Sequence, residues 1–283
     1  MAIIIDGKAL ATKIKENLKS DVKSFYERFK RQITLAVVLV GNNPASEVYV
    51  KNKIKAAENV GIKSLSFTLP EGTEETEIEN LIRTLSADKS VDGILVQLPL
   101  PKHLNEDKIL ALIPSEKDVD GFTAENVGNT VLFKDAIKSC TPSGIMYMLK
   151  SLPVSLSGKH AVVIGRSNIV GKPVSMLLLQ ENCTVCICHS KTENLKEITK
   201  QADILVVAIG RPKFVSADMV KKGAVVIDVG VNRTENGLCG DVDFQAVKEI
   251  ASYISPVPGG VGPMTIAMLM KNAYLCALRR ENA

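Results

Sequence analysis

A glycine-containing turn between an apolar run and a proline is the first candidate for a binding site. Residues 161–164 are apolar and lead into Gly165, and a polar turn containing Ser167 separates that glycine from Gly171. Pro173 suits the first turn of a helix, where its missing N–H costs nothing. The free N–H groups at such a helix start, with the helix dipole behind them, bind phosphate. The segment therefore predicts a dinucleotide-binding crevice, with an ordinary strand–helix turn as the alternative.

The charges around this turn favour NADP over NAD. In the usual G-x-G-x-x-G fingerprint, an acidic residue about 20 positions later binds the ribose hydroxyls, and it would repel a 2′-phosphate. Here no carboxylate stands at that place, where Ser190 and Lys191 follow an apolar run. Arg166, Ser190 and Lys191 could bind the phosphate instead.

Polar side chains in the first half of the chain could form a second site. Gln97 is the one amide in an apolar run that leads into a proline-rich loop, and ligands bind beyond the carboxyl ends of parallel strands. Tyr49 and Lys53 are four residues apart, so they share one face of the helix predicted over residues 45–60. Each residue also has a plain structural interpretation: Gln97 could satisfy nearby backbone groups, and Lys53 could be a solvated helix lysine.

Two loops could contribute to this second site. Residues 117–121 contain Asp118 and Asp120, and one of these carboxylates could bind a polar ligand, although a plain Asp-Gly turn has the same pattern. Residues 256–263 contain three glycines and three prolines. A Gly-Gly pair lets a ligand approach the backbone closely, unless these constraints serve only the turn itself.

A group of cysteines invites comparison with a metal site. Cys183, Cys186, Cys188 and His189 lie close together in sequence, but no second ligand pair stands at a zinc-like spacing. In an extended strand Cys186 and Cys188 share one face. We therefore expect small apolar thiols in a buried strand and no metal.

The elements that would position these residues alternate between helix and strand, which predicts an α/β fold with parallel sheets. The second half has the order of a Rossmann-type fold. A Pro/Gly-rich break at residues 140–144 marks the domain boundary. In the first half we expect helices over residues 6–31, 45–60, 74–86 and 107–112, and strands over 33–40, 62–69 and from 91 into the proline-rich loop; in the second half we expect strands over 160–165, 184–189, 204–210 and 224–230, and helices over 145–152, 174–182, 195–201 and 217–222, with a last apolar helix through 278.

Composition excludes several functional classes. A length of 283 residues suggests about two domains, and a net charge of +4, few aromatic residues and no Trp give no reason to expect nucleic-acid binding. No apolar run approaches the ~18 residues of a membrane span, and the N-terminus lacks a signal-peptide pattern. We expect the six cysteines to be free thiols in the cytoplasm.

Five segments together resemble the bifunctional methylenetetrahydrofolate dehydrogenase/methenyltetrahydrofolate cyclohydrolase family. They are SEVYVKNK at residues 46–53, GILVQLPLP at 93–101, KDVDG at 117–121, GRSNIVGKP at 165–173 and PVPGGVGPMT at 256–265. Asn43, where the family usually has Asp, and Ser139, where it often has Pro, depart from the pattern and put only local turns in doubt.

The resemblance implies two α/β domains around a cleft. A folate-binding catalytic domain would comprise residues 1–139 together with a returning C-terminal helix over 264–283, and a Rossmann-type NADP-binding domain would comprise 140–263. The implied reaction oxidises 5,10-methylenetetrahydrofolate to the methenyl form with NADP⁺ and then hydrolyses it to 10-formyltetrahydrofolate. The family is typically a homodimer.

The resemblance also implies roles for individual residues. Lys53 would be the catalytic lysine, held by Gln97 and flanked by Tyr49, and Asp120 would anchor the pterin ring. A cationic substrate favours the neutral amine, which could then act as a base. The remaining implied contacts are Gly165, Arg166, Ser167, Ser190 and Val231 for NADP, and Pro258, Gly259 and Gly260 for folate.

Three other interpretations remain open at this point. The chain could be a dehydrogenase that has lost the hydrolase, a non-catalytic NADP-binding sensor or scaffold, or an amino-acid dehydrogenase with a similar layout. A sensor would not need Tyr49, Lys53, Gln97 and Asp120 to converge.

Overall fold

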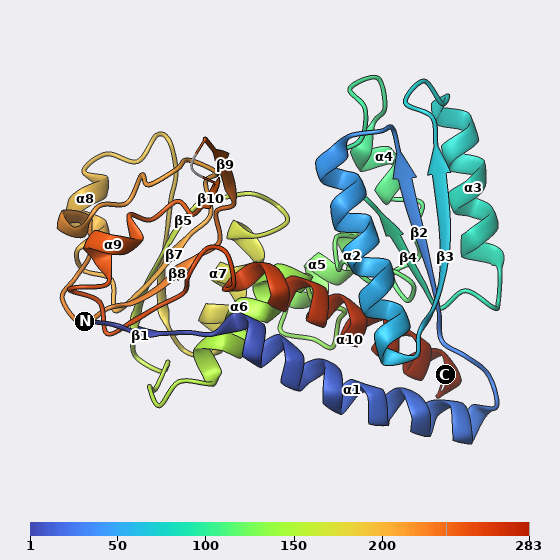
Figure 1. The fold of residues 1–283 in the computed structure, drawn as a ribbon, viewed down its shortest axis with the longest axis horizontal. Coiled ribbons are helices and arrows are strands. Elements are labelled where there is room, and N and C mark those ends of the chain that lie inside the picture. The colour runs from blue at the N-terminus through green and yellow to red at the C-terminus, as the bar shows by residue number, and fades with distance from the viewer. Residues whose placement is uncertain (236, 283) are drawn as a thin grey trace. The chain divides into compact units, whose positions relative to one another are not determined.

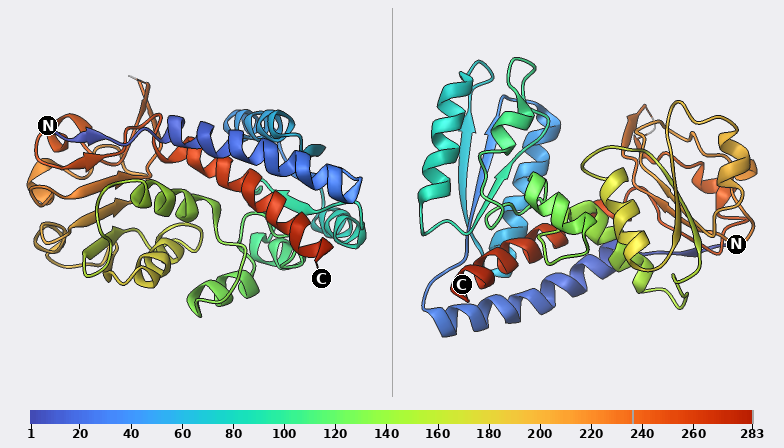
Figure 2. Two further views of the ribbon diagram at one scale, coloured as in Figure 1. Left: turned by 90° about the horizontal axis from the view of Figure 1, so that it is seen from below. Right: turned by 180° about the vertical axis from the view of Figure 1, so that it is seen from behind.

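A computed structural model describes residues 1–235 and 237–282, and the chain folds as two compact units. The three-stranded unit comprises residues 13–140 and the C-terminal residues from Ile266 onward. The six-stranded unit comprises Met1–Thr12 and Thr141–Thr265. Figures 1 and 2 show the elements of each unit.

The three-stranded unit is built on a fully parallel sheet in the order β3-β2-β4. Its strands are β2 (Thr34–Val40), β3 (Lys63–Leu69) and β4 (Gly93–Val96). Every residue of β2 is buried, because a central parallel strand is covered on both faces, and its sequence is therefore almost continuously apolar. In register, Val38 lies between Phe67 of β3 and Val96 of β4.

Helices cover both faces of this sheet, with α2 and α3 on opposite sides in Figure 1. Ile78, Ile82 and Leu85 of α3 join one face of β2 and β4 in a single apolar cluster. Helices α1 and α10 lie side by side in Figure 2, and the rings of Phe25 and Tyr274 meet edge-on at 6.4 Å. The helices that contribute to this unit are α1 (Gly7–Phe29), α2 (Pro44–Val60), α3 (Glu75–Ala87), α4 (Glu106–Leu110), α5 (Ala124–Val131) and α10 (Val261–Glu281).

A buried carboxylate connects three parts of the three-stranded unit. Asp92, just before β4, is fully buried and accepts two hydrogen bonds from the Arg31 guanidinium, each 2.8 Å long. It also accepts from the Arg280 guanidinium at 2.9 Å and from the Thr34 backbone N–H at 2.9 Å. Removal of one partner from such a buried ion pair strongly destabilises the folded protein, because the remaining charge is buried without compensation.

The six-stranded unit is a parallel sheet in the order β1-β11-β8-β7-β5-β6. The chain runs outward from β5 to β6 and then returns to the other side of β5 with β7, so a topological switch point lies between β5 and β7. The strands are β1 (Ile3–Ile4), β5 (His160–Ile164), β6 (Thr184–Cys188), β7 (Ile204–Val207), β8 (Val225–Asp228) and β11 (Tyr253–Ile254), with an antiparallel hairpin of β9 (Asn232–Thr234) and β10 (Gly237–Cys239). The helices are α6 (Cys140–Lys150), α7 (Gly171–Gln180), α8 (Leu195–Thr199) and α9 (Phe244–Val247), and η1 (Ala217–Met219) is a 3-10 turn.

The structure differs from the sequence-based elements in several places. Residues 1–12 group with the six-stranded unit and not with the predicted 1–139 domain, because β1 pairs with β11. The helix expected over 217–222 is only a short 3-10 turn. The elements that were not expected are β1, β11, α5, α9 and the β9–β10 hairpin. Each of these elements is short, so its sequence carries no clear periodicity.

Helix α10 is long and apolar enough to cross a membrane by length and composition, although 56% of that stretch is buried in the fold. Its Asn272 amide donates to the carbonyl oxygens of Val119 and Lys138, at 2.8 and 2.9 Å. A buried core helix has the same composition.

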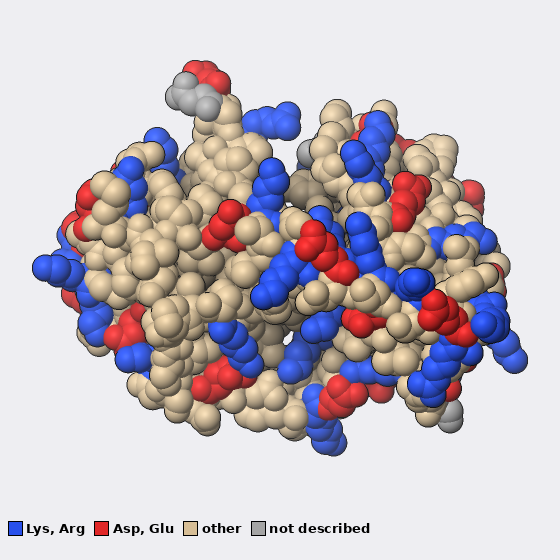
Figure 3. Space-filling view, turned by 60° about the horizontal axis from the view of Figure 1, so that its bottom comes forward, with Lys and Arg blue, Asp and Glu red and all other residues tan. Residues whose placement is uncertain are grey.

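On the face shown in Figure 3, basic and acidic side chains are interspersed, in keeping with a net charge of +4.

Candidate active site and cofactor pocket

The structure brings together Lys53 and Gln97, which are predicted to form a pair. Lys53 lies on α2, and its Nζ donates a hydrogen bond of 2.9 Å to Gln97 Oε1. Gln97 follows β4 directly, and its backbone N–H donates to Val38 O at 2.8 Å. Its Nε2 donates to Leu98 O at 2.5 Å, which leaves the amide oxygen facing the lysine. The lysine amine is thus held at the carboxyl end of the parallel sheet by a neutral amide, and within the described residues it makes no ion pair.

Tyr49 lies one turn before Lys53 on the same helix and is 45% exposed. The helix begins after Asn43, whose Oδ1 accepts from Ser46 N at 3.3 Å. Asn43 therefore caps the helix as the family's usual Asp would. The exposed ring of Tyr49 leaves its face available to a flat ligand beside Lys53.

The two carboxylates of residues 117–121 have different roles. Asp118 is buried, and it accepts from the backbone N–H groups of Gly121 at 2.9 Å and Thr123 at 2.8 Å. It also accepts from Asn126 Nδ2 at 3.0 Å. Asp118 is therefore a structural residue of the turn, which leaves Asp120 as the carboxylate that is free to bind a ligand.

Asp120 is half-buried, and its carboxylate accepts no hydrogen bond from the described residues. Burial raises its pKa to about 6, while the positive charge of Lys53 acts in the opposite direction and the negative charge of Asp118 adds to the rise. The charge of Lys53 thus acts on the Asp120 carboxylate, and Gln97 holds the same lysine. An ionised carboxylate beside an amine that is held by a neutral amide can bind a polar ring and leave the amine free for proton transfer.

The position of Asp120 depends on residues that the sequence did not single out. Asn272 of α10 donates to the carbonyl oxygen of Val119, the residue before Asp120, and to that of Lys138, and Ser139 Oγ donates to Gly121 O at 3.1 Å. The only sequence signal for Asn272 is that it is a lone amide in an apolar helix. The only signal for Ser139 is its departure from the family pattern.

In the six-stranded unit, the predicted phosphate turn lies between β5 and α7. Gly165 has φ +129, and a Cβ there would collide with the carbonyl oxygen of Ala208, so only glycine fits. Ser167, which stands where the fingerprint has a second glycine, accepts from the backbone N–H groups of Val170 at 3.2 Å and Gly171 at 3.3 Å. The serine therefore stabilises the tight turn into α7 through its side chain.

An open pocket of about 300 Å³ lies beyond the carboxyl ends of β5, β6 and β7. Of the five residues predicted to bind NADP, Gly165, Arg166 and Ser190 line this pocket, whereas Ser167 and Val231 lie outside its lining. Val231 follows β8 and is 47% exposed. None of the described residues that line this pocket is a carboxylate, so no negative side chain there would repel a 2′-phosphate. The lining consists of Ile164, Gly165, Arg166, His189, Ser190, Leu195, Ala208, Ile209, Arg211 and Phe214.

Two buried carboxylates, missed at the sequence level, organise the loops around this pocket. Asp241 accepts from the backbone N–H groups of Ile209, Gly210 and Arg211, at 2.8, 2.9 and 2.8 Å. Asp228 accepts from the N–H groups of Asp241 and of the residue after it, both at 2.9 Å. Burial raises the pKa of Asp228 to about 6, against the opposite effect of these hydrogen bonds.

The Pro258–Gly260 loop packs against the start of α1. The N–H of Lys8 donates to Gly259 O at 3.0 Å, and a Cβ at Gly7 would collide with the Gly260 carbonyl. This close approach requires a glycine at position 7, whereas Gly260 is required within its own loop, because a Cβ there would collide with the Pro256 carbonyl oxygen. The role of Pro258, Gly259 and Gly260 as a folate wall stays a prediction.

Cys186 and Cys188 lie in β6 as expected, and Cys183 directly precedes it, but the expected buried strand is wrong: β6 is at the edge of the sheet, and only Cys188 of its five residues is buried. Cys186 Sγ and Cys188 Sγ are 3.9 Å apart, and within residues 1–235 and 237–282 no group of three His, Cys, Asp or Glu side chains is arranged to hold a metal ion.

Two family models match the chain. The model described as the tetrahydrofolate dehydrogenase/cyclohydrolase catalytic domain matches residues 5–120, and the model of the NAD(P)-binding domain of the same family matches residues 139–281. Together they cover most of the chain, and each contains one of the two sites described above.

Known proteins show the same similarity over nearly the full length. The bifunctional protein FolD of Agathobacter rectalis is 59% identical over 96% of this chain and 98% of its own. The crystal structure of the bifunctional FolD methylenetetrahydrofolate dehydrogenase/cyclohydrolase of Campylobacter jejuni superposes with a TM-score of 0.96, at 51% identity, over 99% of this chain and 100% of its own. The FolD structure of Trypanosoma brucei, complexed with NADP cofactor and inhibitor, has a TM-score of 0.95 at 37% identity, over 100% of this chain and 99% of its own.

Proposed function

The chain belongs to the tetrahydrofolate dehydrogenase/cyclohydrolase family, and from this premise we propose which of its residues carry the family's two reactions. The enzyme oxidises 5,10-methylenetetrahydrofolate to 5,10-methenyltetrahydrofolate with NADP⁺ and hydrolyses the methenyl form to 10-formyltetrahydrofolate. Family membership decides against a sensor or an amino-acid dehydrogenase.

In the oxidation, the protein mainly positions two rings, because the substrate nitrogens supply the electronic push. Bound NADP⁺ supplies the hydride acceptor. The turn at Gly165–Ser167 and the N-terminus of α7 would bind its pyrophosphate. Arg166 and Ser190, which line a pocket without carboxylates, would bind the 2′-phosphate, and Val231 would lie near the cofactor.

Asp120 would bind the pterin ring. An ionised carboxylate can accept two parallel hydrogen bonds from the N–H groups of a pterin, and with a pKa of about 6 the Asp120 carboxylate is ionised at neutral pH. The exposed ring of Tyr49 would pack against the folate, and the Pro258–Gly260 loop would form another part of the folate wall.

Lys53 would be the proton-transfer residue of the hydrolysis. A methenyl cation beside the Lys53 amine favours the neutral amine, which can then take a proton from the attacking water. Gln97 would hold this amine in place without adding a charge. The hydrogen bond between Lys53 and Gln97 is the observation that carries the assignment.

A homodimer and a cytoplasmic location complete the proposal. The homodimer rests on the family resemblance alone. The location is supported by six cysteines that are all free thiols, as is usual in a reducing compartment.

One assay tests the whole assignment. 5,10-Methylenetetrahydrofolate is supplied with NADP⁺ or with NAD⁺, and reduced cofactor and methenyl folate are followed together. We expect faster reduction of NADP⁺ and no accumulation of methenyl folate. Accumulated methenyl folate would indicate a dehydrogenase without the hydrolase, and equal rates with NAD⁺ would contradict the proposed 2′-phosphate site.

A further inference from the structure

An arginine–phenylalanine stack forms one wall of the cofactor pocket. The Arg211 guanidinium carbon lies 4.6 Å from the centre of the Phe214 ring, and both side chains line the pocket. Both follow β7, on the side of the switch point opposite to β6. Neither residue has been given a role in the two reactions.

The lining of the pocket divides into two parts. Arg166, His189 and Ser190, which follow β5 and β6, make one part polar. Leu195 of α8 and the residues that follow β7 make the other part largely apolar, and the stack of Arg211 on Phe214 belongs to this second part. A phosphorylated ribose suits the first part, and a flat, uncharged ring suits the second.

The backbone of Arg211 is fixed before any ligand arrives. Asp241 accepts hydrogen bonds from three successive N–H groups that end with the N–H of Arg211 itself. Within the described part of the chain, no carboxylate lies at ion-pair distance from the Arg211 guanidinium. Its side chain is exposed, so one face of the planar group lies over Phe214 while the other is free for a ligand.

We propose that the adenine ring of NADP stacks on the free face of the Arg211 guanidinium, with Phe214 as the support behind it. The proposal rests on the proposed cofactor site and identifies which part of the cofactor binds on its apolar side. A guanidinium is planar and weakly hydrated, so it stacks on aromatic rings, and a lysine cannot replace it in this geometry. On this assignment Arg211 contributes equally to the binding of NADP and of NAD, whereas Arg166 discriminates between them.

Two fragments without nicotinamide test the assignment by calorimetry: ADP-ribose and its 2′-phosphate. They differ only in the 2′-phosphate, and neither undergoes reaction. We expect Arg211→Ala to weaken the binding of both by the same factor, about tenfold, as stacked bases respond to loss of their partner. Arg211→Lys, which keeps the charge, should weaken the binding of both fragments by the same factor.

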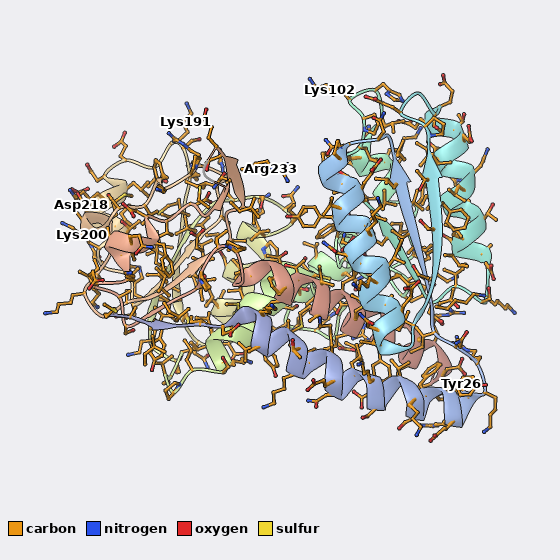
Figure 4. The ribbon with its side chains drawn as sticks, in the orientation of Figure 1. Tyr26, Lys102, Lys191, Lys200, Asp218 and Arg233 are labelled. Carbon is orange, nitrogen blue, oxygen red and sulfur yellow. The ribbon has the colours of Figure 1, made fainter. Side chains whose placement is uncertain are left out.

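Two control variants complete the experiment. Arg166→Ala should weaken binding of the 2′-phosphorylated fragment alone. Lys200→Ala removes an exposed positive charge directly after α8, labelled in Figure 4, and should change neither affinity.

Three results would overturn the proposal: a loss confined to the 2′-phosphorylated fragment, full binding by Arg211→Lys, or no loss in Arg211→Ala. The first would make Arg211 a phosphate ligand. If the wild-type chain bound neither fragment, the proposed cofactor site itself would be wrong, which is a separate result.

Discussion

Replacing Lys53 by methionine tests the centre of the proposed mechanism. Methionine is similar in length and is unbranched, so it fills the same space on α2 but removes the amine that lies 2.9 Å from Gln97 Oε1. A positioned general base contributes about 10²–10⁴-fold to a rate. We therefore expect hydrolysis of the methenyl substrate to fall by at least about 100-fold. Hydride transfer should continue, because it requires no proton transfer by the protein.

The assay separates the two reactions. Preformed 5,10-methenyltetrahydrofolate is mixed with enzyme, and the loss of its absorbance is compared with the spontaneous rate in the same buffer. The dehydrogenase is measured separately as reduced NADP, so that Lys53→Met should accumulate methenyl folate during turnover. Both kcat and KM are required, because an effect on KM alone would indicate a binding role.

Lys55→Met is the matched control for this experiment. Lys55 is on the same helix and is exposed, whereas Lys53 is half-buried against Gln97. The control should keep both activities. Wild-type hydrolysis by Lys53→Met would refute the assignment of the base, and equal losses in the two variants would show that the helix, and not the amine, is the cause.

Three further predictions concern other parts of the structure. Gln97→Leu should lower the hydrolase kcat by up to about 10-fold, because one hydrogen bond between neutral groups is worth roughly 0.5–1.5 kcal/mol and its loss leaves the amine unheld; unchanged kcat would contradict a positioning role. The KM for folate should rise about tenfold between pH 7.5 and 5, because a group with a pKa of about 6 passes from about 3% to about 90% protonated and the ionised Asp120 is the binding form; Asp120→Asn should bind weakly at every pH, and a flat wild-type profile would remove Asp120 from the site. Asp92→Ala should lower the free energy of unfolding by about 3 kcal/mol in urea, since two arginines lose a fully buried partner; Asp135→Ala, which removes an exposed ion pair, should change it by less than ~1 kcal/mol.

The family resemblance predicted that Gln97 holds Lys53, and the regular α/β fold explains why the two side chains meet. Helix α2 follows β2, and β2 pairs with β4 in parallel register, so the helix and the end of β4 lie at the same edge of the sheet. The turn after β5 could be predicted from the residues themselves, because an apolar strand, a glycine and a helix start are all local sequence signals. The serine at position 167, where the fingerprint has a glycine, is explained only by the structure, in which its hydroxyl accepts two backbone hydrogen bonds that stabilise the turn.

The structural carboxylates could not be predicted because their partners are distant in sequence. Asp241 holds backbone N–H groups about 30 residues away, as its hydrogen bonds to Ile209, Gly210 and Arg211 show, and no periodic pattern marks such a residue. From the residues alone Asp118 and Asp120 were equivalent candidates in one turn, and only the family resemblance favoured Asp120. Only the burial of Asp118 and its N–H donors decide which carboxylate is structural.

The pairing of β1 with β11 has a consequence for the order in which the protein can fold during synthesis. Ile3 leaves the ribosome first, but its partner Tyr253 is made when almost all of the chain has been translated. Until then, the sheet edge at β11 is missing and the apolar N-terminal strand has nothing to pair with. A nascent chain is therefore exposed to edge-to-edge association for most of its synthesis. For the same reason, a fragment that starts after residue 12 would leave β11 as an open edge.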